Sequence, residues 1–249
     1  MHSYLKLKNS DQIAYCKTEG KGPGIIFLGG FLSEMTGEKA TAVEAFCKQR
    51  GQAFVRFDYR GRGQSSGVFE DHTIGTWKED ALAILSKLTK GPQLLIGSSM
   101  GGWLALLLAM EKPKRVAGII GLASAPDFTE HLIWEKLTKA QQQEIIRKGK
   151  ITVPSDMGGV YSITRKLIED GRNHLLLHKR EIPIDCPVRL LHGLKDDDVP
   201  WEVSLSINEK LASQDVKTIL IENGDHRLSK PEDIQKLLSI TEKMLEKLK

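Results

Sequence analysis

The pentapeptide 97–101 has the pattern Gly-x-Ser-x-Gly, with Ser99 at its centre. An apolar run, 93–96, leads into it, and an Ala- and Leu-rich stretch, 102–109, follows it. A sharp turn from a strand into a helix exposes one hydroxyl above the edge of a sheet, and small residues tolerate its strained backbone. The pattern is common by chance, but its position between a strand-like and a helix-like segment predicts that Ser99 is a nucleophile.

A serine hydroxyl becomes reactive when a base takes its proton, and an acid must orient that base. After a nucleophile on such a turn, the acid and then the base follow along the chain. The β-type run 188–192 precedes three consecutive aspartates, and the β-type run 216–221 precedes His226. Although an aspartate run is usually a solvated turn and a lone histidine usually a surface residue, their order at strand ends predicts Asp196 as the acid and His226 as the base.

Other histidines and cysteines could compete for these roles. His192 lies in the apolar end of the run 188–192, which favours a buried structural residue. The others lie away from a comparable strand end, at the N-terminus, or without the turn that a nucleophile needs. They are His2, His72, His131, His174, His178, Cys16, Cys47 and Cys186.

A tetrahedral oxyanion needs two backbone donors beside the nucleophile. One is the N–H of the residue after the nucleophile, Met100, and the other comes from a loop after an early strand. The apolar run 24–28 ends in Gly29 and Gly30, which let the backbone approach a substrate closely, so Phe31 is the predicted second donor. A simple turn at the end of a strand remains the alternative.

The chain as a whole has the composition of a globular protein. Its 249 residues can bury one substantial core, which predicts a single domain over 1–249. A net charge of +4 is spread without a basic block, so nucleic acid is not implied. Three widely spaced cysteines argue against a disulfide framework. No leader, membrane span, metal-ligand spacing or phosphate-binding loop is evident, so we expect a cytoplasmic protein without cofactor or metal. The oligomeric state is left open.

Strand-like and helix-like segments alternate, which predicts an α/β fold with a mostly parallel sheet and helices on both faces. Active residues of such sheets gather at the carboxyl ends of the strands. A capping-box pattern, 76–79, opens one of the helices. The predicted elements are a hairpin (4–8 and 12–16), strands at 24–28, 53–57, 93–97, 116–122, 188–192 and 216–221, and helices at 37–50, 76–90, 100–111, 201–212 and from 231.

The stretch 126–185 is far longer than one crossover helix requires. It contains two helical patterns, 138–148 and 160–171, and an insertion at this point would form a cap over the catalytic edge. Its apolar and aromatic side chains could line an acyl pocket or could form the small core of the cap itself. The candidates for substrate binding are Trp134, Met157 and Tyr161, with Leu132 beside them.

The segment 58–65 resembles the Asp-x-Arg-Gly-x-Gly-x-Ser signature of the α/β-hydrolase superfamily. Gly29 stands where many members have histidine, which removes a side chain but no backbone donor. Nearly the whole chain is similar to a branch of mitochondrial esterases that act on acyl glucuronides and on S-acylated proteins. The resemblance implies the α/β-hydrolase fold with a helical cap and places nucleophile, acid and base on Ser99, Asp196 and His226. Without a transit segment, the chain is expected to be a bacterial relative. The residues that carry this resemblance are 56–59, 97–103, 186–193, 195–197, 199–201 and 225–227.

These residues predict a serine esterase or thioesterase that works through an acyl-enzyme. The substrate would be a small-molecule ester or thioester, with an acylated protein as the open alternative. An acyltransferase, a peroxidase or a C–C hydrolase could use the same three side chains. A non-catalytic ligand-binding protein of the same fold is a further alternative, which the complete set of Ser99, Asp196 and His226 argues against.

Overall fold

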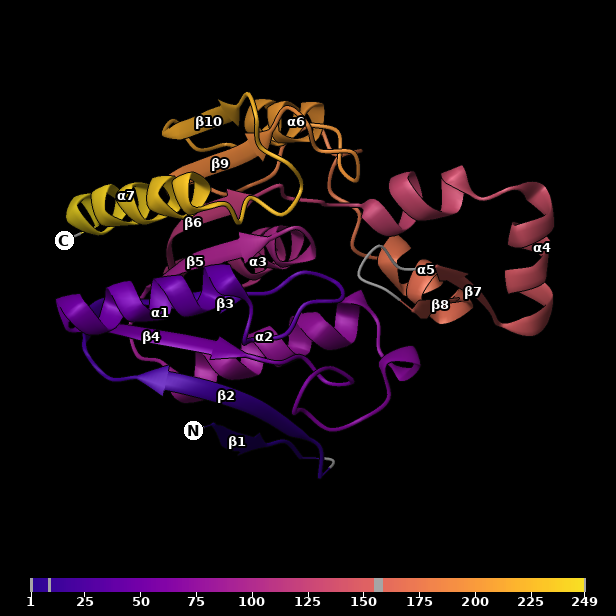
Figure 1. The fold of residues 1–249 in the computed structure, drawn as a ribbon, viewed down its shortest axis with the longest axis horizontal. Coiled ribbons are helices and arrows are strands. Elements are labelled where there is room, and N and C mark those ends of the chain that lie inside the picture. Colours follow the sequence, from indigo (N-terminus) through magenta and orange to yellow (C-terminus); the bar gives the residue numbers. More distant parts are fainter. Residues whose placement is uncertain (1, 9, 155–158, 249) are drawn as a thin grey trace.

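A mostly parallel sheet of eight strands forms the centre of the protein. The computed structural model describes residues 2–8, 10–154 and 159–248. The strand order is β1-β2-β4-β3-β5-β6-β9-β10, and only β1 and β2 run antiparallel to their neighbours. This confirms the predicted α/β fold (Figure 1). The strands are β1 (Ser3–Lys6), β2 (Gln12–Thr18), β3 (Lys21–Leu28), β4 (Gln52–Phe57), β5 (Gln93–Ser98), β6 (Val116–Leu122), β9 (Val188–Gly193) and β10 (Val216–Ile221).

Helices cover both faces of the sheet, so its central strands are buried on both sides and read as continuous apolar runs. One face carries α1 and α7, and the other carries α2, α3 and α6. In α3, ten of the twelve residues are buried, which explains its Ala- and Leu-rich sequence. The helices are α1 (Glu38–Arg50), α2 (Ile74–Leu88), α3 (Met100–Glu111), α6 (Glu202–Lys210) and α7 (Pro231–Lys247).

The start of α2 corrects one detail of the sequence analysis. The capping box begins at Thr73 and not at Thr76. The Thr73 backbone N–H donates to the Thr76 hydroxyl at 2.6 Å, and the Thr76 N–H donates back to the Thr73 hydroxyl at 3.5 Å. A threonine therefore takes the place that Glu or Gln has in the usual pattern, and the helix starts two residues before the predicted position.

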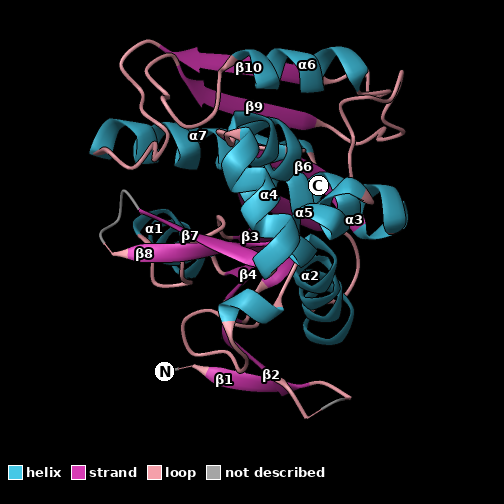
Figure 2. Ribbon diagram, turned by 90° about the vertical axis from the view of Figure 1, so that its right-hand side faces the viewer, coloured by secondary structure: helices cyan, strands magenta, loops and turns pink. Residues whose placement is uncertain are grey.

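The insertion between β6 and β9 lies beyond the carboxyl ends of the parallel strands, in front of the sheet in Figure 2. The helix predicted over 160–171 is wrong in its first part, because 160–164 forms a strand that pairs with β7. Its β-branched and aromatic residues favour a strand, and the Thr164 hydroxyl then caps α5. The elements are η3 (Thr129–Ile133), η4 (Trp134–Lys136), α4 (Lys139–Lys148), β7 (Lys150–Pro154), β8 (Val160–Thr164) and α5 (Arg165–Arg172).

A buried carboxylate links the two ends of this insertion, where the chain leaves the sheet and returns to it. Asp127, which has a φ of 62° and is fully buried, accepts the backbone N–H groups of Leu176 and Leu177 at 2.8 and 2.7 Å. The chain leaves the sheet beside Asp127 and returns past the two leucines. One side chain thus ties together the outgoing and returning ends of the insertion.

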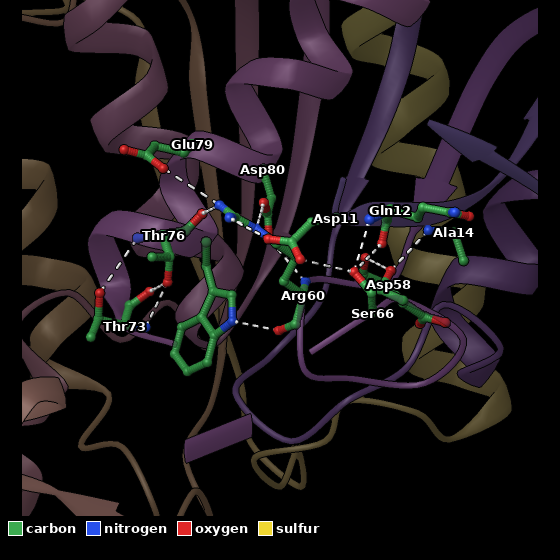
Figure 3. Close-up of polar contacts among 12 residues, drawn as sticks. Asp11, Gln12, Ala14, Asp58, Arg60, Ser66, Thr73, Thr76, Glu79 and Asp80 are labelled. Atoms are coloured by element: carbon green, nitrogen blue, oxygen red, sulfur yellow. Dashed lines mark hydrogen bonds and ion pairs between the residues drawn. The ribbon is translucent and has the colours of Figure 1, made fainter. Parts of the chain in front are cut away.

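The signature segment 58–65 directly follows the carboxyl end of β4 and takes part in a polar network (Figure 3). Arg60 Nε donates to the fully buried Asp80 at 2.6 Å. Asp58 accepts the backbone N–H of Met35 at 2.6 Å and that of Gln64 at 2.9 Å. Met35 belongs to the loop that follows β3 and contains Phe31, so the signature holds this loop in place.

Candidate active site

Ser99 lies on the turn between β5 and α3 in a strained backbone conformation, with φ 54° and ψ −117°. Its N–H donates to the carbonyl of Leu122 at 2.8 Å. A Cβ on Gly97 would collide with the backbone of Gly101, and a Cβ on Gly101 would collide with the backbone of Leu28. Both glycines are therefore required by close backbone packing, as the pentapeptide pattern predicts.

Three loops bring the predicted acid, base and nucleophile together. His226, in the loop between β10 and α7, lies with Nε2 3.2 Å from Oγ of Ser99. The other ring nitrogen, Nδ1, lies 2.8 Å from Oδ2 of Asp196, which follows β9. The Asp196 side chain is fully buried, whereas that of His226 is 23% exposed. This is the order of contacts that serine activation needs.

Asp196, and not its two neighbours, faces the imidazole. Its second oxygen, Oδ1, accepts the backbone N–H groups of Asp198 at 3.0 Å and Val199 at 2.8 Å. Asp197 and Asp198 are exposed, and no side-chain hydrogen bond caps the start of α6. Burial opposes ionisation of Asp196, but hydrogen bonds from two imidazoles and from Val199 outweigh it and hold its pKa well below the usual range. The carboxylate is therefore ionised and rigidly oriented.

The second imidazole belongs to His192, which the sequence analysis assigned only a buried structural role. Burial is correct, since His192 has no exposed surface. Its Nε2, however, lies 3.0 Å from Oδ2 of Asp196, the oxygen that also contacts His226. The spacing of four residues between a strand-end histidine and the acid is the signal that could have indicated this contact.

One predicted oxyanion donor, Met100, directly follows Ser99, and the other, Phe31, directly follows Gly30 in a loop close to Ser99. Met100 is the first residue of α3, where a backbone N–H has no acceptor within the helix. A Cβ on Gly30 would lie 3.6 Å from the Cβ of Ser99, so the loop that precedes Phe31 passes close to the nucleophile. The placement agrees with the expected donors, whose action on an oxyanion stays a prediction.

The ring of Phe31 is held among aromatic side chains from four segments of the chain. All four contacts are edge-to-face, an arrangement that aromatic pairs favour. Together they form an aromatic cluster around Phe31, which directly follows Gly30 in the loop close to Ser99. The ring centroids lie 5.1 Å from Phe69, 5.2 Å from Phe128, 5.7 Å from Trp77 and 5.9 Å from Tyr161.

The three predicted cap residues have different surroundings. Tyr161, on β8, reaches the Phe31 ring and thus the loop beside Ser99. Both Tyr161 and Trp134 pack against the insertion's own apolar cluster, and the guanidinium of Arg172 lies 4.9 Å from the ring centroid of Trp134. Met157 lies outside the described residues. The insertion therefore has a small core of its own and also contributes an aromatic side chain toward the site.

Burial disfavours a cysteine nucleophile in this protein. It raises the pKa of the Cys47 thiol to about 12 and that of Cys186 to about 11, so both stay protonated at neutral pH. A metal could find possible ligand atoms within 4.8 Å of one another on Asp196, Asp198 and His226. Two of these side chains already hydrogen-bond each other at 2.8 Å, an arrangement suited to proton transfer.

Comparisons with known proteins agree with this architecture. A family model described as the alpha/beta hydrolase fold matches residues 23–148. The rat protein named palmitoyl-protein thioesterase ABHD10, mitochondrial, is 44% identical over 99% of this chain and 83% of its own length.

Two solved structures resemble the whole chain. The alpha/beta hydrolase domain-containing protein 10 from mouse superposes with a TM-score of 0.93 at 43% identity, covering 100% of both chains. A crystal structure from Agrobacterium vitis S4 also gives a TM-score of 0.93, at 36% identity and 98% coverage of both chains. The similarity therefore extends through the insertion as well as the sheet.

Proposed function

We propose that this chain, which belongs to the α/β-hydrolase family, cleaves carboxylic esters or thioesters with Ser99 as nucleophile, His226 as base and Asp196 as the acid that orients it. The observation that carries this assignment is the continuous contact from Asp196 through both nitrogens of His226 to the Ser99 hydroxyl, at 2.8 and 3.2 Å. No metal or cofactor enters the chemistry.

The reaction proceeds in two acyl-transfer steps. Oγ of Ser99 attacks the substrate carbonyl while Nε2 of His226 takes the hydroxyl proton. The N–H groups of Met100 and Phe31 stabilise the oxyanion, a contribution of about 3–4 kcal/mol for each donor. His226⁺ then protonates the leaving alcohol or thiol as the carbonyl–heteroatom bond breaks. Water, activated by His226, then attacks the acyl-enzyme. In the resulting tetrahedral intermediate the bond between the acyl carbon and Oγ breaks, the carboxylic acid leaves, and His226 returns a proton to Ser99.

The insertion, placed over the carboxyl ends of the strands, acts as a cap that selects the acyl group. The ring of Tyr161 lies 5.9 Å from that of Phe31, whose loop passes close to Ser99, and this aromatic contact supports a hydrophobic acyl chain over a polar one. The rat relative is named a palmitoyl-protein thioesterase, which supports a long-chain thioester as the substrate. An acylated protein and a small acyl thioester both present this group.

The cellular compartment is a separate matter. Among the described residues, no helix is both long and apolar enough to cross a membrane. The rat relative is named as mitochondrial, so the cytoplasmic location expected from the sequence stays a prediction.

Paired serine variants test the function. Ser99→Ala should abolish hydrolysis of palmitoyl-CoA and p-nitrophenyl acetate and should prevent labelling by a fluorophosphonate probe. Ser98→Ala is the matched control: Ser98 is buried at the end of β5, and this variant should keep the label. Peptide mapping then locates the phosphonyl group. A label on Ser98, or full turnover in folded Ser99→Ala, would overturn the assignment.

A further inference from the structure

A chain of hydrogen bonds extends from the proposed catalytic acid into the interior of the protein. His192, at the end of β9, has no exposed surface and lies with Nδ1 2.7 Å from the hydroxyl of Ser204 on α6. Its other nitrogen, Nε2, lies 3.0 Å from Oδ2 of Asp196 and 3.0 Å from the carbonyl oxygen of Val199. Ser204 is equally buried.

These contacts define the tautomer of His192. Both groups that face Nε2, a carboxylate and a carbonyl, can only accept hydrogen bonds, so Nε2 must carry the proton. In the neutral ring, Nδ1 is then an acceptor, and the Ser204 hydroxyl donates a hydrogen bond to it. A neutral ring also avoids the cost of burying a second charge where no solvent reaches it.

We propose that His192 is a positioning residue of the triad, which donates from Nε2 to Asp196 and fixes both the orientation and the basicity of that carboxylate. The proposal rests on the proposed function, since it concerns the same triad. Oδ2 of Asp196 is shared by His192 at 3.0 Å and His226 at 2.8 Å. Competition between two donors for one oxygen makes the acid a weaker partner for His226 than an unshared carboxylate would be.

The effect of the shared Asp196 oxygen on activity has a predicted sign, which the pH profile of kcat/KM can measure. If the His192 donor is removed, more of the negative charge of Asp196 is available to stabilise protonated His226. The acid limb of kcat/KM then moves to higher pH. A residue that only filled space would leave this limb where it is.

Other charged groups surround the pair and should be kept constant. Lys195, Asp197 and Asp198 lie on the same turn as Asp196, and Asp225 and Arg227 flank His226. From α1, Lys39 donates to the backbone carbonyl of Arg227 and to the hydroxyl of Ser229 at 3.2 Å. None of these residues is changed in the variants below.

The experiment compares His192→Leu with His192→Gln and with Leu190→Ala. Leucine removes the donor, whereas the amide of glutamine can place an N–H near the position of Nε2. Leu190→Ala opens a cavity on the same strand, where Leu190 is 1% exposed, without touching the acid. For each folded variant, kcat and KM are measured from pH 4 to 9, with melting temperature as the test of folding.

For His192→Leu, we expect kcat to fall by about tenfold or more, with KM changed by less than about twofold. The acid limb should move up by roughly half a pH unit or more. His192→Gln should restore the limb, and Leu190→Ala should lower the melting temperature without moving it. If His192→Leu does not fold, Ser204→Ala carries the test, with a smaller shift in the same direction.

An unmoved limb in His192→Leu, or in Ser204→Ala where that variant is needed, would overturn the proposal. Failure of glutamine to restore the limb would overturn it as well. Failure of the proposed function would look different, because the unaltered protein itself would not label at Ser99 with the fluorophosphonate probe.

Discussion

Replacing Asp196 with asparagine should stop turnover by forcing His226 into the wrong tautomer. Oδ1 of Asp196 accepts the backbone N–H groups of Asp198 and Val199 at 3.0 and 2.8 Å, and these groups can only donate. The backbone groups cannot change their protonation, whereas both imidazoles at Oδ2 can change tautomer, so asparagine should keep its carbonyl oxygen at the Oδ1 position and turn its NH₂ group toward His226 and His192. The ring then accepts at Nδ1 and carries its proton on Nε2, so it can no longer take the proton of Ser99.

The expected loss in kcat is about 10⁴-fold, the size of the effect that the corresponding change has in serine proteases. At about 1.36 kcal/mol for each factor of ten, this raises the barrier by about 5.4 kcal/mol. KM should change by less than about twofold, because the Asp196 side chain is fully buried and does not reach the substrate. Turnover of p-nitrophenyl acetate by the purified variant measures both quantities, and circular dichroism confirms that it is folded.

Asp197→Asn is the matched control, since it makes the same chemical change on an exposed residue of the same turn. Its kcat should stay within about twofold of the unaltered protein. Near-normal turnover in Asp196→Asn together with an inactive Asp197→Asn would refute the reasoning and move the acid by one residue.

Four further predictions concern pH, acyl chain and stability. Because Asp196, with its depressed pKa, stays ionised above pH ~4, the acid limb of kcat/KM should have a one-proton slope between pH 4 and 7; a two-proton slope would contradict this. The stability that Asp196 adds is present above pH ~4 and is lost as the pH falls toward its folded pKa, so urea titrations of the unaltered protein and Asp196→Asn should converge in acid. In a series of p-nitrophenyl esters from C2 to C10, kcat/KM should rise about tenfold or more, since each buried CH₂ contributes about 0.8 kcal/mol. Tyr161→Ala should flatten this rise, whereas Trp134→Ala should not. A flat series in the unaltered protein would refute the apolar pocket. Asp127→Asn should lower the free energy of unfolding by about 1–3 kcal/mol, because it leaves one buried backbone N–H without an acceptor, and an unchanged urea midpoint would show that the base of the insertion does not depend on this carboxylate.

The sheet and the nucleophile turn could be predicted from the sequence because their signals are local. The run 116–122 and the helix 100–111 have the predicted bounds, since a buried strand and a helix buried all round each show their environment in consecutive residues. The pentapeptide around Ser99 is a contiguous pattern and can be recognised in the sequence, although only Gly97 is required by a contact within the turn, whereas Gly101 is required by the backbone of Leu28 on β3.

Other features depend on partners that are distant in the sequence or chemically unusual. Asp127 reaches backbone groups about fifty residues away, and nothing in its own neighbourhood indicates them. The predicted start of α2 lies two residues too late, because the reciprocal cap at Thr73 uses a second threonine in place of Glu or Gln. The strand 160–164 directly precedes α5. The predicted helix therefore includes residues that pair instead with β7. Trp134 could equally have faced the site or the cap's own core, a choice that only tertiary packing decides.

The choice among three adjacent aspartates follows from the close packing of two strand ends. In the parallel pair β9 and β10, Gly193 stands opposite Ile221, and a Cβ on Gly193 would collide with the backbone of Gly224. Just beyond this contact, the backbone N–H of Lys195 donates to the carbonyl of Gly224 at 2.9 Å. Asp196 directly follows Lys195, and His226 is the second residue after Gly224. This backbone contact therefore brings Asp196 close to His226, and Oδ2 of Asp196 lies 2.8 Å from Nδ1 of His226. Gly193, which ends β9, and Gly224, three residues beyond the end of β10, thus permit the close backbone approach that places Asp196 against His226.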